Sequence, residues 1–195
     1  MGYLRGFLPW ITFDAVSLFG SQRAALVALV MTTYFLVKDR RAGVAADAQI
    51  LDFGTIAYFG MLTAVAFADP HSPLLNYESG LSSMWLALIA GVSLLVRQPF
   101  TLGIAKRRTP PEIWRTPRFR HTSTVIARVW AISFTFGAAA TLVCEATGTS
   151  QVIRAVIQVL AFGVPATFTH QYVKKVRARK AAPVATTESV PVAGE

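Results

Sequence analysis

The chain has 195 residues, of which 53% are hydrophobic and 15% are charged, and it carries a net charge of +9. A soluble domain normally has about a quarter of its residues charged, so this composition excludes an ordinary soluble globular fold and predicts an integral membrane protein. The apolar residues form blocks of roughly 20, the length that crosses ~30 Å of hydrocarbon as a helix. We therefore expect an all-α fold: a polytopic transmembrane bundle of five spanning helices plus a short N-terminal half-membrane or re-entrant helix.

The first predicted helix covers residues 7–20. Pro9 suits a first helical turn and Gly20 suits a helix C-cap. This segment reaches only ~21 Å as a helix, which is too short to span a bilayer comfortably. No small-x-small cleavage site follows it, so we interpret it as a retained half-buried or re-entrant helix.

Five longer apolar segments follow and are predicted to span the membrane. They cover residues 21–38, 49–68, 81–105, 122–146 and 151–175. Residues 1–180 then form one integral membrane domain, because no interval between the segments is long enough to bury a core of its own. Residues 181–195 mix Pro, Ala, Thr and Val without a helical period and are predicted to be a disordered cytoplasmic tail.

The basic residues predict the orientation. Residues 38–41, the Pro-rich loop 106–120 and the segment 174–180 contain 14 of the 19 Lys and Arg residues, and all three fall on one side if five spans alternate. The opposite connections, 69–80 and 147–150, contain none. The positive-inside rule places the basic side and the C-terminus in the cytoplasm.

The basic loop also predicts the partners of the protein. We expect it to contact anionic inner-leaflet headgroups through Lys106, Arg107, Arg108, Arg115, Arg118 and Arg120. We expect no nucleic-acid partner, because no aromatic platform accompanies the charge.

Four ionisable residues within apolar segments are the candidate polar site: Asp14, Asp52, Arg97 and Arg128. In one interpretation the arginines extend to the inner headgroups and each aspartate pairs with one of them. In the other, the residues line a vestibule open to the cytoplasmic leaflet, where two arginines hold a carboxylate or a lipid phosphate. Pro99 is predicted to kink the third span, as in segments that line cavities.

Other chemistry is not indicated. His71 lies in an outer loop while His121 and His170 lie near the inner boundary, so the histidines predict no metal site. No phosphate-binding loop, dinucleotide fingerprint or zinc-protease motif is present. We therefore expect no catalytic residues, no metal and no cofactor, and we expect a protein that is not an enzyme.

The layout resembles a known family. The resemblance rests on Phe7-Leu8-Pro9 opening a short apolar helix, five further spans in fewer than 200 residues, a basic break after the third span and a basic tail. These features resemble the intracellular septation protein A family. The stretches 97–101 and 110–114 are also similar to actinobacterial integral membrane proteins. The resemblance implies a bacterial inner-membrane protein of the cell envelope or division machinery that works through protein partners, and it carries over no catalytic residues.

Two functional hypotheses follow. The first is a non-enzymatic envelope or division-associated protein that assembles with other membrane proteins or as a homodimer through seams of small residues. The second is a small transporter or lipid-handling protein that uses Asp14, Asp52, Arg97 and Arg128 around a polar vestibule open to the cytoplasm. The first hypothesis predicts that substitutions in the packing seams impair function most. The second predicts that substitutions of the buried charged residues do.

Overall fold

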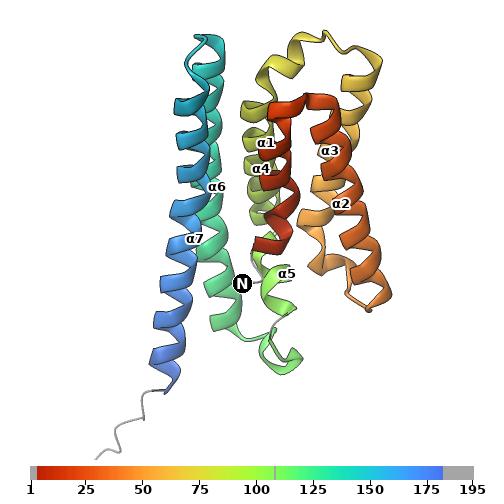
Figure 1. Cartoon of the computed structure of the whole chain (residues 1–195). Helices are drawn as coiled ribbons and strands as arrows, with labels where there is room; N and C mark the ends of the chain where they lie inside the picture. Colours follow the sequence, from red (N-terminus) through yellow and green to blue (C-terminus); the bar gives the residue numbers. More distant parts are fainter. Residues whose placement is uncertain (1–3, 108, 182–195) are drawn as a thin grey trace, which may run out of the picture.

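The computed structural model describes residues 4–107 and 109–181, and these residues are helical apart from short connections (Figure 1). Four of the helices are long and apolar enough to cross a membrane: α3, α4 with the turn before it, α6 and α7. Within these residues the α-helices are α1 (Leu8–Val16), α2 (Ser21–Arg41), α3 (Ile50–Ala68), α4 (Glu78–Leu95), α5 (Phe100–Lys106), α6 (Pro117–Ala146) and α7 (Gln151–Ala181).

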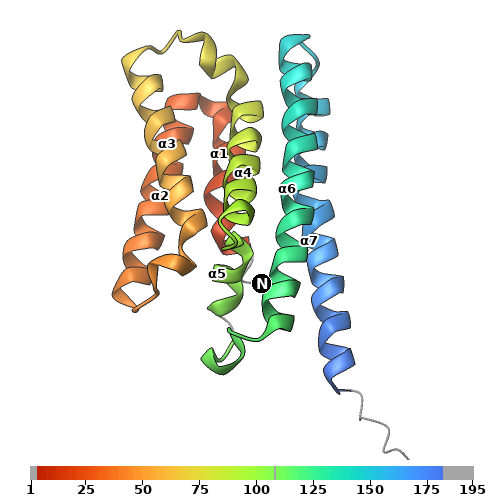
Figure 2. The same ribbon diagram turned by 180° about the vertical axis from the view of Figure 1, so that it is seen from behind.

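The long helices lie side by side in an elongated bundle, with α2 and α3 at one edge and α6 and α7 at the other (Figures 1 and 2). The α6 helix packs along both α4 and α7, and α2 packs along α3. The short helix α1 lies between these groups and packs on α2, which follows it after a sharp turn at Gly20. α1 and α4 thus lie between the two edges of the bundle, with α1 on one side of α4 (Figures 1 and 2).

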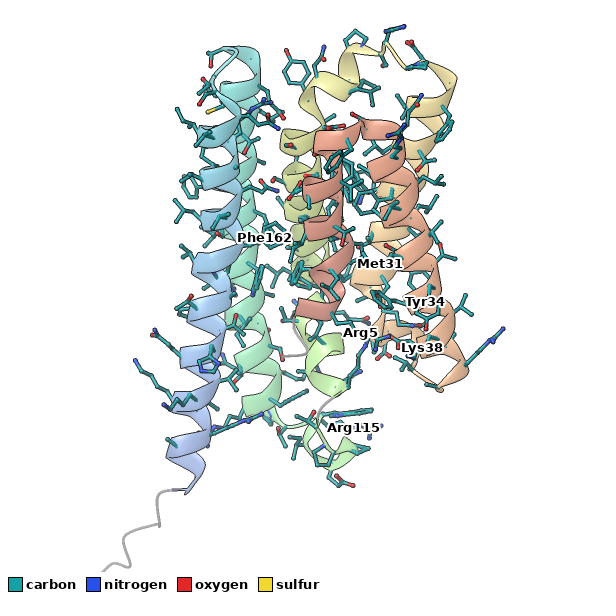
Figure 3. The ribbon with its side chains drawn as sticks, viewed as in Figure 1. Arg5, Met31, Tyr34, Lys38, Arg115 and Phe162 are labelled. Carbon is teal, nitrogen blue, oxygen red and sulfur yellow. The ribbon has the colours of Figure 1, made fainter. Side chains whose placement is uncertain are left out.

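The basic segments all meet at the lower end of the bundle in Figure 1, where α2 ends, α5 and α6 are joined, and α7 ends. Arg5, Lys38 and Arg115 all lie toward this end in Figure 3. The turns before α4 and between α6 and α7 lie at the other end and contain no Lys or Arg. We call these the basic end and the far end.

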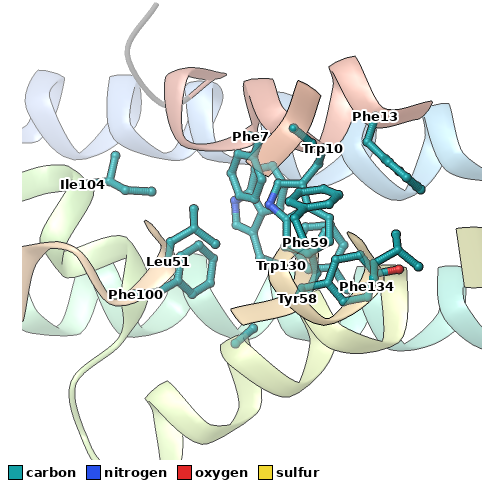
Figure 4. Packing of buried hydrophobic residues seen from close by; sticks show 14 of the residues in the cluster. Phe7, Trp10, Phe13, Leu51, Tyr58, Phe59, Phe100, Ile104, Trp130 and Phe134 are labelled. Carbon is teal, nitrogen blue, oxygen red and sulfur yellow. The ribbon is translucent and has the colours of Figure 1, made fainter. Parts of the chain in front are cut away.

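An aromatic core lies along one face of α1 and of the turn before it (Figure 4). Phe7, Trp10 and Phe13 are spaced along one face of this segment and are 1%, 1% and 0% exposed. The Phe7 ring stacks on Trp130 of α6 with 4.6 Å between ring centroids, and the Trp10 ring stacks on Tyr58 of α3 at 5.0 Å. Burial of such rings is the main stabilising contribution of a core, so α1 joins the two edges of the bundle.

The polar atoms of the core tryptophans have hydrogen-bond partners. The Trp10 indole N–H donates to Thr55 Oγ1 at 3.1 Å, and the Trp130 indole N–H donates to Thr169 Oγ1 at 3.0 Å. Each threonine hydroxyl in turn donates to a backbone carbonyl one helical turn earlier. Paired in this way, the indoles lie inside an apolar core without an unsatisfied donor.

Small residues allow close contacts at several places, and two of these position α3 and α5. A Cβ added to Gly54 of α3 would lie 2.5 Å from the Ile89 side chain of α4, so this glycine lies in a packing seam. A Cβ added to Gly103 of α5 would lie 2.7 Å from the backbone oxygen of Ala48. Because that neighbour is backbone and cannot rotate away, Gly103 fixes α5 against the turn that precedes α3.

Several helix boundaries differ from the sequence-based expectation. The first predicted helix, 7–20, ends as an α-helix at Val16, and α2 continues to Arg41. The predicted third span, 81–105, is divided into α4 and α5, and Pro99 is the N-cap of α5 instead of a kink within one helix. The α6 helix begins at Pro117, five positions before the expected start, because Thr116 caps it and proline is favoured in a first helical turn. The α7 helix continues to Ala181, and the expected tail, 181–195, lies otherwise outside the described residues.

Candidate functional site: an arginine cavity at the helix break

The break between α4 and α5 has the geometry of a Schellman motif. The Gln98 N–H donates to Ser93 O at 2.9 Å, and the Arg97 N–H donates to Leu94 O at 3.0 Å. In this motif the residue after the C-cap adopts the left-handed conformation and is usually glycine. Here that residue is Arg97, with φ of 57°, the one positive φ of a non-glycine residue in the described part of the chain.

Ser93 of α4 connects the two sides of the break through the hydrogen bonds of its hydroxyl group. The Phe100 N–H lies in the first turn of α5, where a backbone donor has no partner within its own helix. It donates to Ser93 Oγ at 3.1 Å. The same hydroxyl donates to Ala90 O at 2.8 Å. The N–H groups of Arg97, Gln98 and Phe100 at the break therefore all have hydrogen-bond partners.

A row of polar residues on α6 faces this turn. Arg120, Thr124 and Arg128 follow one another at intervals of four, which places them on one side of the helix. The two arginines are separated by ~12 Å along the helix axis at 1.5 Å per residue. The Thr124 hydroxyl donates to Arg120 O at 2.9 Å, so the guanidinium groups are the free donors of the row.

Arg97, Arg120 and Arg128 line one cavity of about 410 Å³, which we call the arginine cavity. Its other lining residues are Leu94, Leu95, Pro99, Leu102 and Thr124, so none of the lining residues is acidic. Among the residues that the structure describes, no carboxylate forms an ion pair with any of the three arginines. Three positive charges without a counterion repel one another. An anion with several oxygens would compensate these charges and accept hydrogen bonds from the guanidinium groups.

The four predicted site residues are not gathered in one place. Arg97 and Arg128 share the arginine cavity, as the vestibule interpretation expects, but neither aspartate lines it. Asp52 is buried at the basic end and accepts from Arg107 Nη2 at 2.6 Å. Asp14 lines a different cavity. The expected pairing of each aspartate with Arg97 or Arg128 is therefore wrong.

Asp52 belongs to a buried ion-pair network at the basic end. Arg107 donates to Asp39 at 2.7 Å and to Asp52 at 2.6 Å, and Arg5 donates to Asp39 at 2.9 Å. The side chains of Asp39 and Asp52 are only 8% and 11% exposed. The network joins the ends of α2, α3 and α5 to the segment before α1, so its role is structural.

The basic residues that were expected to contact lipid headgroups lie in different surroundings. Arg107 is occupied by the buried network, and Lys106 pairs with Asp47 and lies over the Trp114 ring, so both have partners within the chain. Arg115 is exposed, Arg118 donates to Val176 O at 3.1 Å, and Arg120 lines the arginine cavity. Arg108 lies outside the described residues.

A second polar cavity, of about 520 Å³, lies at the far end and was missed by the sequence reasoning. Asp14, Glu78 and Glu145 line it together with Arg154 and Gln158. Both carboxylate oxygens of Glu145 lie 3.2 Å from the Gly80 N–H, which donates to them. These residues come from four different helices, so their spacing along the chain gave no signal of their proximity.

No protein-family model, no curated protein and no solved structure matches this chain. Within residues 4–107 and 109–181, no group of three or more His, Cys, Asp or Glu side chains is arranged to hold a metal ion. The candidate site therefore rests on its own geometry: an arginine cavity at a helix break, suited to an oxyanion such as a phosphate group.

Proposed function

We propose that this is a non-enzymatic, multi-pass protein of the bacterial inner membrane that binds phosphate groups of anionic lipids in the arginine cavity. The observation that carries the proposal is the meeting of Arg97, Arg120 and Arg128 around one cavity without an acidic lining residue. Guanidinium groups bind phosphate through paired, charge-assisted hydrogen bonds. Uncompensated arginines at membrane depth usually indicate a binding or transport role.

The proposed topology brings this cavity to the inner leaflet. We count α2 as a fifth span and α1 as a half-membrane helix, and we assign the basic end to the cytoplasm. The positive-inside rule supports this orientation, because 14 of the 19 Lys and Arg residues lie in segments that join or end the helices at the basic end. Anionic lipids are concentrated in that leaflet, where Lys and Arg near the surface attract them.

Purified protein in detergent tests the proposal through the shift in unfolding temperature on adding phosphatidylglycerol. We expect a rise that phosphatidylcholine does not give. Because charge-assisted hydrogen bonds contribute about 1.5–3 kcal/mol each, the double variant Arg120→Gln/Arg128→Gln should weaken phosphatidylglycerol binding at least about tenfold. Arg115→Gln, which removes one exposed charge of the loop before α6, outside the cavity, is the control and should bind as the wild type does.

Two results would contradict this proposal. An equal loss of binding in the Arg115→Gln control would mean that general surface charge, and not the cavity, attracts the lipid. An equal thermal shift with inorganic phosphate alone would assign the cavity to a free phosphate and remove the lipid from the proposal.

A second candidate function, assembly with a second copy of the chain or another membrane protein, is favoured by α7. Of the most apolar 18 residues of α7, only 17% are buried, against 39% in each of the other three candidate spans. Val152, Val156 and Val159 are 73%, 53% and 69% exposed, so this helix presents an apolar face that nothing else in the described chain covers.

Disulfide trapping in native membranes tests this assembly. In a Cys144→Ala background, Val159→Cys should form an intermolecular disulfide with a second copy. Met61→Cys on α3, where the residue is 49% exposed, is the control and should remain monomeric. Equal trapping at both positions would reflect random collision in the bilayer and would contradict a specific α7 interface.

A further inference from the structure

A third cavity lies at the basic end between α5, α6, α7 and the loop that joins α5 to α6. Its volume is about 520 Å³, and it shares no lining residue with the arginine cavity. Its walls combine apolar groups from α5, α6 and α7, among them Ala105, Phe119, Ile126, Val173 and Val176. Cavities of this size with a mostly apolar lining and a few polar groups are typical of sites for small amphipathic ligands.

The loop that closes the cavity is folded by its own contacts. The Trp114 indole N–H donates to Thr109 O at 2.9 Å, and the Thr109 hydroxyl donates to Ala105 O at 2.9 Å. Thr116 caps the start of α6. These bonds order the loop, which contributes Thr109, Ile113 and Thr116 to the cavity wall.

The charge of the cavity favours an anionic ligand. Arg118 and Arg177 line it, and none of its lining residues is acidic. Arg118 crosses from α6 to α7, where its Nη2 donates to Val176 O at 3.1 Å. The remaining N–H groups of this guanidinium are available to an oxyanion. An apolar interior next to two arginines matches a molecule with an alkyl chain and a negatively charged head.

We propose that this cavity holds one alkyl chain of an anionic phospholipid, with its phosphate beside Arg118 and Arg177. The bound lipid would then pack between α6 and α7 at the level of the inner headgroups and fill a space that the side chains leave open. This site is distinct from the arginine cavity, and the inference does not rest on the lipid-binding function proposed for Arg97, Arg120 and Arg128.

Native mass spectrometry of delipidated protein, after addition of dioleoyl phosphatidylglycerol, tests the inference by counting the lipids retained per chain. Val173→Trp fills the cavity from α7 and should lose one bound lipid. Met61→Trp on the exposed face of α3 should lose none. Arg120→Gln/Arg128→Gln should lose only the lipid of the arginine cavity, so Val173→Trp should remove one further lipid in that background. In the same background, Arg118→Gln/Arg177→Gln should keep a lipid but bind phosphatidylcholine and phosphatidylglycerol equally.

The inference is overturned if Val173→Trp retains as many lipids as the wild type, or if Met61→Trp loses as many as Val173→Trp. If Val173→Trp does not fold, as judged by its elution from a sizing column, Ala105→Leu reduces the cavity from α5 and serves instead. A loss of lipid only in Arg120→Gln/Arg128→Gln would support the arginine cavity and overturn this second site. The two proposals can therefore fail separately.

Discussion

Arg97→Gly should make the protein more stable and, at the same time, a weaker binder of anionic lipid. A left-handed conformation costs a residue with a Cβ roughly 1–2 kcal/mol, whereas glycine adopts it freely but loses more backbone entropy on folding. The net gain should be about 1 kcal/mol, or a rise of about 2–4 °C in unfolding temperature for a chain of this size. Thermal unfolding in detergent measures the stability, and titration with phosphatidylglycerol measures the binding.

The matched variant is Arg97→Ala, which removes the guanidinium but keeps a Cβ in the left-handed position. It should bind as weakly as Arg97→Gly without the gain in stability. If both variants bind phosphatidylglycerol as the wild type does, Arg97 has no part in the site. If Arg97→Gly is less stable than Arg97→Ala, the left-handed turn is not a source of strain. The pair therefore separates the backbone effect from the charge.

Arg107→Ala should be the most destabilising of the substitutions considered for this protein, by about 3 kcal/mol or more. The Arg107 side chain is 23% exposed and holds Asp39 and Asp52, and its removal leaves two largely buried carboxylates short of a partner. Breaking a buried ion pair from one side costs about 3–5 kcal/mol, because the remaining charge stays buried. Chemical unfolding in mixed micelles would measure the loss.

Two controls accompany this prediction. Arg107→Ala/Asp52→Asn should recover part of the lost stability, because it removes one of the stranded charges. Lys106→Ala, next to it in the sequence, should change stability by only about 0.5 kcal/mol, because its partner Asp47 is 46% exposed. Equal effects of Arg107→Ala and Lys106→Ala would show that the network contributes no more than a surface ion pair.

Much of the architecture follows from sequence patterns alone, since composition and blocks of apolar residues predicted an all-helical membrane protein, and the structure has four helices able to span. The break after Leu95 was less predictable. Pro99 indicated a disturbance, but the left-handed turn at Arg97 replaces the usual glycine, so the standard signal for a helix end was missing.

The candidate site was predicted in part. In one of the two interpretations Arg97 and Arg128 lie together at similar depth, nine and eight residues from the ends of the basic loop, and they do line one cavity. Arg120 was assigned to the headgroups because it lies in the basic loop. The partners of Asp14 and Asp52 depend on how the helices are rotated and packed, and an aspartate carries no sequence signal that distinguishes Arg107 from Arg97. Helix depth can be counted from sequence, whereas helix rotation is set by packing.

The stacking of Phe7 on Trp130 has a consequence for biosynthesis. These two rings are more than half the chain apart in sequence, and Phe162, whose ring centroid lies 5.6 Å from that of Phe7, is farther still. A ribosome therefore delivers the central segment long before the helices that enclose it. Until α6 and α7 have been inserted, Phe7 must be sheltered by lipid or by the insertion machinery. Completion of the native interior is thereby coupled to the last stage of translation.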